Sequence, residues 1–145
     1  MLRNTVSDKK LAVDIHGGVL LWIGLWWWRQ PIIDLSWPLH APLRFILPVV
    51  IYPLLEEIIF RGGVQPFLLK YSLGQFSRNG VTLANLTTSI IFAFTHFLVH
   101  GTILAAATFF PSLAFGYFRD RYGSLTLPIV LHSFYNCGYV LLFAA

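Results

Sequence analysis

Three short motifs place ionisable side chains inside apolar stretches of the sequence. The first is the run LLEEIIFRGG, which contains Glu56, Glu57 and Arg61. Glu57 and Arg61 are four residues apart, and on a helix this spacing favours a structural ion pair. Glu56 has no partner in its own segment, so it is either a general base or a protonated contact between helices. The spacing alone leaves these two interpretations equally open.

The second and third motifs supply two histidines and an amide. Phe92 and His96 are four residues apart in FAFTHFLVH, as are His132 and Asn136 in LHSFYN. Each pair therefore shares one face of a helix. A neutral His and an Asn can each donate a hydrogen bond to a developing oxyanion. The alternatives are hydrogen bonds between helices and, for His132 with Asn136, a binding site for a polar ligand.

Zinc binding is a weaker interpretation of the histidines. His96 and His100 have the His-x-x-x-His spacing of helical zinc sites. His100 falls at the end of its segment beside Gly101, where an interfacial histidine is common. The Glu that follows the first histidine in zincins is Phe97 here, so that motif is absent. The sequence therefore gives the metal interpretation little weight.

The composition indicates that these motifs lie in a membrane. Of 145 residues, 57% are hydrophobic and only 11% are charged. A soluble domain of this size leaves about 30% of its surface exposed and cannot hide so much apolar area. The net charge of +4 is scattered between apolar runs, which excludes nucleic-acid binding. The single Cys137 excludes a disulfide framework and a cysteine zinc site.

Five segments are candidates for membrane-spanning helices. A span needs about 20 largely apolar residues, and the candidates lie at roughly 13–28, 43–60, 82–100, 101–118 and 126–144. The second contains Pro48 and Pro53 and in one interpretation continues to about Lys70. A tight turn near Gly101 makes the third and fourth antiparallel neighbours. We predict an all-α polytopic transmembrane bundle, with 1–145 forming one membrane domain.

The basic residues predict the orientation of the chain. With the N-terminus in the cytoplasm, most Lys and Arg side chains fall on the inner side, and Arg29 and Arg44 fall outside. A cleaved signal peptide would also begin with basic residues. However, no small-x-small cleavage site follows the tryptophans at 26–28, so we expect an uncleaved first helix.

Together the motifs contain what the hydrolysis of a substrate by water requires. An unpaired Glu, two His and an Asn on three predicted helices can act as base, water-positioning group and oxyanion donors. No Ser or Cys nucleophile stands in an obvious motif, so activated water would be the nucleophile. In these spans the depths of His96 and His132 differ by roughly 10 Å, at about 1.5 Å per residue. Helix tilt, or a longer and shifted third helix, must close this gap.

The order Glu-Glu-x-x-x-Arg, Phe-x-x-x-His and His-x-x-x-Asn resembles the CPBP family of glutamic-type intramembrane proteases. That family includes the type II CAAX prenyl endopeptidases and the bacterial proteins once called Abi. The resemblance runs from Glu56 to Asn136. It implies a minimal CPBP-like catalytic core, with the motif-bearing part at about 43–145.

The resemblance implies a role for each motif residue. Glu56 would be the general base, and His96 would share its water. His132 and Asn136 would stabilise the oxyanion. The other motif residues would give structural support: Glu57, Arg61 and Phe92. The glutamic mechanism needs no metal, so the resemblance implies no cofactor, with zinc as the less favoured alternative.

The resemblance further implies an integral protein of a bacterial inner membrane that cleaves a membrane-anchored protein or peptide. Small bacterial members of the family are associated with C-terminal sorting signals, so the substrate hypothesis is such a signal or a CAAX-like tail. The oligomeric state is not indicated. Three alternatives stay open: a non-catalytic membrane immunity or binding protein, a zinc-dependent membrane protease, and a small transporter.

Overall fold

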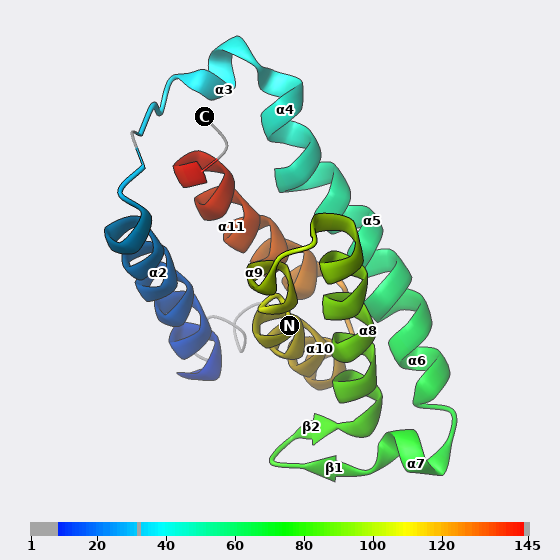
Figure 1. Ribbon diagram of the computed structural model, residues 1–145. Helices are drawn as coiled ribbons and strands as arrows, with labels where there is room; N and C mark the ends of the chain where they lie inside the picture. The colour runs from blue at the N-terminus through cyan, green and yellow to red at the C-terminus, as the bar shows by residue number, and fades with distance from the viewer. Residues whose placement is uncertain (1–8, 32, 144–145) are drawn as a thin grey trace.

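This computed structural model describes residues 9–31 and 33–143. The last residue of the fifth predicted span, 144, lies outside them. The described chain is almost entirely helical (Figure 1). The α-helices are α2 (Lys9–Arg29), α3 (Trp37–His40), α4 (Pro42–Ile46), α5 (Tyr52–Ile59), α6 (Gln65–Leu68), α7 (Ser72–Gln75), α8 (Leu83–His100), α9 (Ile103–Ala106), α10 (Phe109–Tyr122) and α11 (Thr126–Phe143). A short antiparallel hairpin, β1 (Ser77–Arg78) and β2 (Val81–Thr82), precedes α8.

The predicted all-α membrane bundle is confirmed. The predicted number of five membrane spans stays a prediction. Three helices of the described part are long and apolar enough to cross a membrane: α2, α8 and α11. Their bounds agree with the first, third and fifth predicted segments to within a few residues. The second and fourth segments form differently.

The second segment forms an almost continuous helical rod over 42–68, which includes the longer extent considered from the sequence. Two π-helical stretches interrupt the regular turns of this rod, η1 (Leu47–Ile51) and η2 (Phe60–Val64). Pro48 lies in η1 and removes one backbone donor there. The wider π turns commonly occur at functional sites, and here they flank α5, which carries Glu56 and Glu57.

The predicted fourth span over 101–118 is wrong in its bounds. The chain turns at Gly101, where φ is 65°, and forms only the short α9 before α10 begins at Phe109. Thr102 caps α9 by accepting a hydrogen bond from the backbone N–H of Ala105. The hydroxyl of Thr108 then donates to the carbonyl of Ala105. Pro111 has no backbone N–H to donate to the carbonyl of Ala107, so the helix is interrupted there, and α10 starts at Phe109 and runs on to Tyr122.

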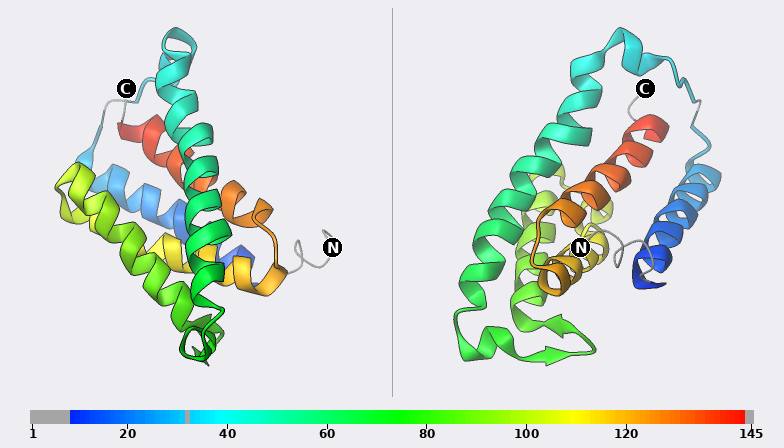
Figure 2. Two further views of the ribbon diagram at one scale, coloured as in Figure 1. Left: turned by 90° about the vertical axis from the view of Figure 1, so that its right-hand side faces the viewer. Right: turned by 180° about the vertical axis from the view of Figure 1, so that it is seen from behind.

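The longest helices pack around α10 and α11. α10 packs against both α8 and α11, and α11 also packs against η1, α5 and α2. α2 stands to one side of the rod (Figures 1 and 2). It meets α11 where the ring of Trp22 lies against Phe134, with ring centroids 4.5 Å apart. The site must therefore form between the rod, α8, α10 and α11.

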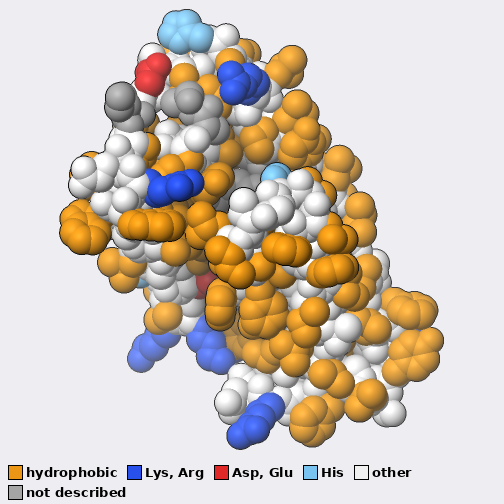
Figure 3. Space-filling view, in the orientation of Figure 1, with side chains coloured by type: hydrophobic (Ala, Val, Ile, Leu, Met, Phe, Trp, Pro, Cys, Tyr) orange, Lys and Arg blue, Asp and Glu red, His pale blue; other side chains and the backbone are white. Residues whose placement is uncertain are grey.

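The molecule is largely apolar outside, and its interior holds buried polar side chains beside a hydrophobic core. Hydrophobic side chains cover most of the face in Figure 3, as expected for a surface in contact with lipid. The fully buried polar side chains come from the rod, α8 and α10: Glu57, Arg61, Gln65, Asn85, Thr88, Ser89 and Ser112. Buried polar groups need partners, so these side chains fix how the helices fit together.

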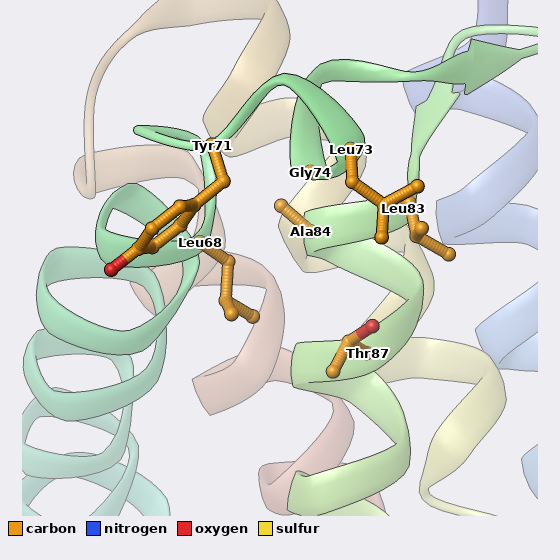
Figure 4. Close-up of a pocket in the computed structure, with 7 residues that line it drawn as sticks. All are labelled: Leu68, Tyr71, Leu73, Gly74, Leu83, Ala84 and Thr87. Carbon is orange, nitrogen blue, oxygen red and sulfur yellow. The ribbon is translucent and has the colours of Figure 1, made fainter.

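A pocket of about 200 Å³ opens between α6, α7 and the start of α8 (Figure 4). Its lining is almost wholly apolar: Leu68, Tyr71, Leu73, Gly74, Leu83, Ala84 and Thr87. None of the predicted site residues lines it. The candidate site is therefore a separate feature of the molecule.

Candidate active site

Three helices bring Glu56, His96 and His132 together. Glu56 lies on α5, His96 one turn before the end of α8, and His132 in the second turn of α11. Oε2 of Glu56 is 3.8 Å from Nε2 of His96 and 3.6 Å from Nε2 of His132. The depth gap expected from straight spans is thus closed, because α8 and α11 cross the rod obliquely (Figure 2, left).

The ring orientation of each histidine is set by the hydrogen bond at its other nitrogen. Nδ1 of His96 lies 2.9 Å from the carbonyl oxygen of Phe92, so Nδ1–H donates to that oxygen. Nδ1 of His132 lies 2.9 Å from Oε1 of Glu57 and donates to that carboxylate. In the neutral ring this leaves Nε2 as an acceptor, and both Nε2 atoms face Glu56.

The three side chains differ in how open they are. The side chains of Glu56 and His96 are 30% and 20% exposed, whereas that of His132 is 5% exposed. Glu56 is therefore the most accessible of the three. A gap of 3.6–3.8 Å between acceptor atoms is too long for a direct hydrogen bond and suits a bridging water.

Glu57 points away from this gap and is fully buried. Its Oε1 accepts from Nη1 of Arg61 at 3.0 Å, so the ion pair predicted from their spacing is present. The same oxygen accepts from His132, a contact that the sequence analysis missed. No sequence signal could have found it, because the two residues are 75 positions apart.

Arg61 is held by α10 as well as by Glu57. Its Nη2 donates to the backbone oxygen of Ser112 at 2.9 Å and also to the Ser112 hydroxyl. The guanidinium lies 4.8 Å from the ring centre of Phe92 and 5.5 Å from that of Phe115. Ser112 and Phe115 were not singled out in the sequence. Ser112 has one sequence signal, a hydroxyl within a largely apolar segment, and Phe115 has none.

Aromatic rings form the walls around the histidines. The ring of Phe92 is 4.3 Å from that of His96 and 5.6 Å from that of His132. Phe115 stacks on His132 at 5.0 Å with an interplanar angle of 21°. These ring contacts limit the freedom of the imidazoles.

Asn136 lies one turn after His132 and contacts the rod. Its Nδ2 donates to the carbonyl oxygen of Pro48 at 2.8 Å, in the π-helical stretch η1. A side-chain amide has two N–H donors, so this bond orients the group and leaves a second donor. Of the four residues expected to do chemistry, the structure gathers Glu56 with the two histidines, and it anchors Asn136 beside them on α11.

His96 and His100 have the spacing that was considered, with little weight, for zinc. The rings of His96 and His100 lie 6.1 Å apart at an angle of 39°. Within residues 9–31 and 33–143, no group of three or more His, Cys, Asp or Glu side chains is arranged so that it could hold a metal ion.

Comparison with known proteins identifies a family for most of the chain. The family model described as Type II CAAX prenyl endopeptidase Rce1-like matches residues 38–138. That range holds all three motifs and leaves α2 outside. No curated protein and no solved structure matches the chain.

Proposed function

The chain belongs to the Rce1-like family of type II CAAX prenyl endopeptidases, and from that premise we propose that Glu56 activates the water that cleaves its substrate. Family membership makes the protein a CAAX-type intramembrane protease that acts on a membrane-associated protein. The three helices that are long and apolar enough to span a bilayer agree with this. The finer proposal is a glutamic-type endopeptidase.

One observation supports the proposal above all: Oε2 of Glu56 faces Nε2 of both His96 and His132, at 3.8 and 3.6 Å. A water between these atoms would donate one hydrogen to the carboxylate and the other to an imidazole. A general base must reach its proton directly or through one water, and this geometry meets that condition. His96 is then the residue that shares the water.

In the proposed reaction, Glu56 carries out both proton transfers. Glu56 takes a proton from the water as the water oxygen bonds to the substrate carbonyl carbon. The carbonyl oxygen becomes an oxyanion. When the C–N bond breaks, protonated Glu56 returns its proton to the leaving amine, as a base that becomes the acid.

His132 and Asn136 are proposed as the oxyanion donors. His132 would donate from Nε2 in its doubly protonated form, since Nδ1–H is already directed at Glu57. Asn136 would donate the N–H that Pro48 does not use. Preorganised donors of this kind typically contribute about 10²–10³ in kcat. Glu57, Arg61 and Phe92 are proposed as support, and no metal or other cofactor is needed.

We propose a bacterial inner membrane as the location, with the N-terminus in the cytoplasm. Lys9, Lys10, Lys70 and Arg78 lie toward the end of the molecule that holds the start of α2 and the hairpin, against Arg29 and Arg44 toward the other end; Figure 3 shows Lys and Arg side chains at both ends. The cytoplasmic side of membrane proteins carries such an excess. The proposed substrate is a membrane-anchored protein with a C-terminal sorting signal or a CAAX-like tail.

The test compares purified wild-type protein with Glu56→Gln in liposomes. Each is incubated with membrane extract of the host, and new peptide termini are identified by mass spectrometry. Asp34→Asn is the matched control, because it makes the same chemical change in an exposed loop outside the site. Hydrogen bonds from Ser36 keep the pKa of Asp34 below its usual value, so the control also removes a charge.

We expect new termini with wild type and Asp34→Asn and none with Glu56→Gln. His132→Ala should also abolish cleavage while the protein still inserts into the membrane. Equal cleavage by wild type and Glu56→Gln would refute the role of Glu56. Folded wild type that yields no Glu56-dependent termini would favour a binding or immunity protein instead.

A further inference from the structure

A chain of buried hydrogen bonds links α10 to the candidate active site. It starts at Ser112 and passes through Arg61 and Glu57 to His132. Resting on the function proposed above, we propose that Ser112 is a positioning residue for peptide hydrolysis, acting on His132 through Arg61 and Glu57. Ser112 itself contacts neither Glu56 nor the gap between the histidines among the interactions of the described residues.

The first link fixes the guanidinium of Arg61. Phe92 and Phe115 lie against this group at 4.8 and 5.5 Å, which restrains its plane. Ring contacts leave the group free to rotate within that plane. Hydrogen bonds from Nη2 to the carbonyl oxygen and hydroxyl of Ser112 define the rotation. α10 thus determines where Nη1 points.

The second link connects Arg61 to the carboxylate of Glu57. Nη1 of Arg61 donates to Oε1 of Glu57 at 3.0 Å. That oxygen also accepts from Nδ1 of His132 at 2.9 Å. Since one oxygen serves both donors, a shift of Arg61 changes the acceptor that orients the imidazole. His132 then no longer holds Nε2 at its place beside Glu56.

Burial makes the chain sensitive to a single lost hydroxyl. Glu57, Arg61 and Ser112 are each 0% exposed. Bulk water does not reach these atoms to replace a missing partner, and hydrogen bonds to charged groups are about twice as strong as neutral ones. The backbone oxygen of Ser112 would remain in a variant. Loss of the hydroxyl should therefore weaken the position of Arg61 without releasing it.

The experiment measures steady-state cleavage by Ser112→Ala and Ser112→Thr in liposomes. The matched control is Ser89→Ala, which also removes a buried hydroxyl, one that donates to Asn85 on α8. We expect Ser112→Ala to lower kcat about tenfold with KM unchanged, the size of one charged hydrogen bond. Ser112→Thr keeps the hydroxyl and should retain most of kcat, and Ser89→Ala should keep the wild-type kcat.

A double-mutant cycle tests the route. In a Glu57→Gln background the chain of hydrogen bonds from Ser112 to His132 is already broken, so Ser112→Ala should lower kcat no further. Additive losses in kcat would mean that Ser112 acts by another path and would overturn the proposal. So would wild-type kcat in Ser112→Ala, or equal losses in Ser112→Ala and Ser89→Ala.

A second measurement does not depend on activity. In protein with labelled histidines, the proton on Nδ1 of His132 should give a downfield nuclear magnetic resonance signal that is lost in Glu57→Gln. We expect Ser112→Ala to shift this signal and Ser89→Ala to leave it in place. An unshifted signal would refute the positioning role. If the signal shifts as expected but no cleavage depends on Glu56, the proposed function is refuted. The chain of hydrogen bonds from Ser112 to His132 would still be supported.

Discussion

Nδ1 of His132 lies 2.9 Å from Oε1 of Glu57, although the residues are 75 positions apart in the chain. Glu57 therefore has two partners, since the same oxygen also accepts a hydrogen bond from Nη1 of Arg61. An ion pair between Glu57 and Arg61 would by itself only neutralise charge inside the bundle. The contact with His132 connects that pair to the proposed reaction, because it determines which nitrogen of the imidazole faces Glu56.

This contact predicts that Glu57→Gln affects stability and activity together. The change leaves the buried guanidinium of Arg61 without its counter-charge, and breaking a buried pair in this way typically costs about 3–5 kcal/mol. We expect a lower melting temperature in detergent. We also expect a lower kcat at temperatures where the variant is still folded. Asp34→Asn is the control at an exposed carboxylate. An unchanged melting temperature would contradict the structural role of Glu57.

A second prediction concerns Asn136, which is anchored to Pro48 and proposed as an oxyanion donor. Asn136→Asp keeps the shape of the side chain and removes both N–H donors. We expect kcat to fall about a hundredfold, as for loss of one oxyanion donor. The melting temperature should fall as well, because the Pro48 carbonyl loses its partner. A lower melting temperature with wild-type kcat would mean that Asn136 only supports the rod.

A third prediction uses two glycines in different surroundings. A Cβ at Gly116 would overlap the amide oxygen of Asn85, a fully buried residue whose Oδ1 accepts from the Ser89 hydroxyl and whose Nδ2 donates to the Leu113 carbonyl. Gly116→Ala should therefore lower the free energy of unfolding by about 1–3 kcal/mol. A Cβ at Gly24 would meet nothing within 4 Å, so Gly24→Ala should be neutral or slightly stabilising. Chemical denaturation in detergent compares them, and equal stability would contradict the packing of α10 on α8.

A fourth prediction concerns metal. Glutamic chemistry needs no metal, so a strong zinc chelator should leave cleavage unchanged. Elemental analysis of purified protein should find well under one zinc per chain. Zinc at one per chain, together with its loss in His96→Ala, would establish the zinc-dependent alternative and refute the metal-free mechanism.

The motifs could be identified from the sequence because their spacing is local. Glu57 with Arg61 and Phe92 with His96 are each one helical turn apart, and both pairs are in contact in the structure. The family membership predicted from the three motifs is confirmed by the match over 38–138. The single domain over 1–145 and the roles of the individual site residues stay predictions.

The errors arose where the local pattern was ambiguous. The run after Gly101 is mostly apolar, so hydrophobic periodicity did not predict a separation of α9 from α10. Pro111 lacks the backbone N–H that a continuous helix would need there, and the Thr108 hydroxyl bonds to the carbonyl of Ala105 at the end of α9. The depth gap between His96 and His132 followed from treating the spans as straight and parallel, whereas α8 and α11 are inclined to the rod.

The amino-acid sequence was enough to assign the membrane class, the helical segments that carry the motifs and the residues available for chemistry. Composition and one-turn spacing are sufficient for these, because they depend on solvent preference and on helix geometry. The packing of the helices was needed to find that Glu56 faces both histidines, that Glu57 bonds to His132 and that Ser112 bonds to Arg61. These contacts join different helices, and they depend on crossing angles that hydrophobic periodicity does not encode.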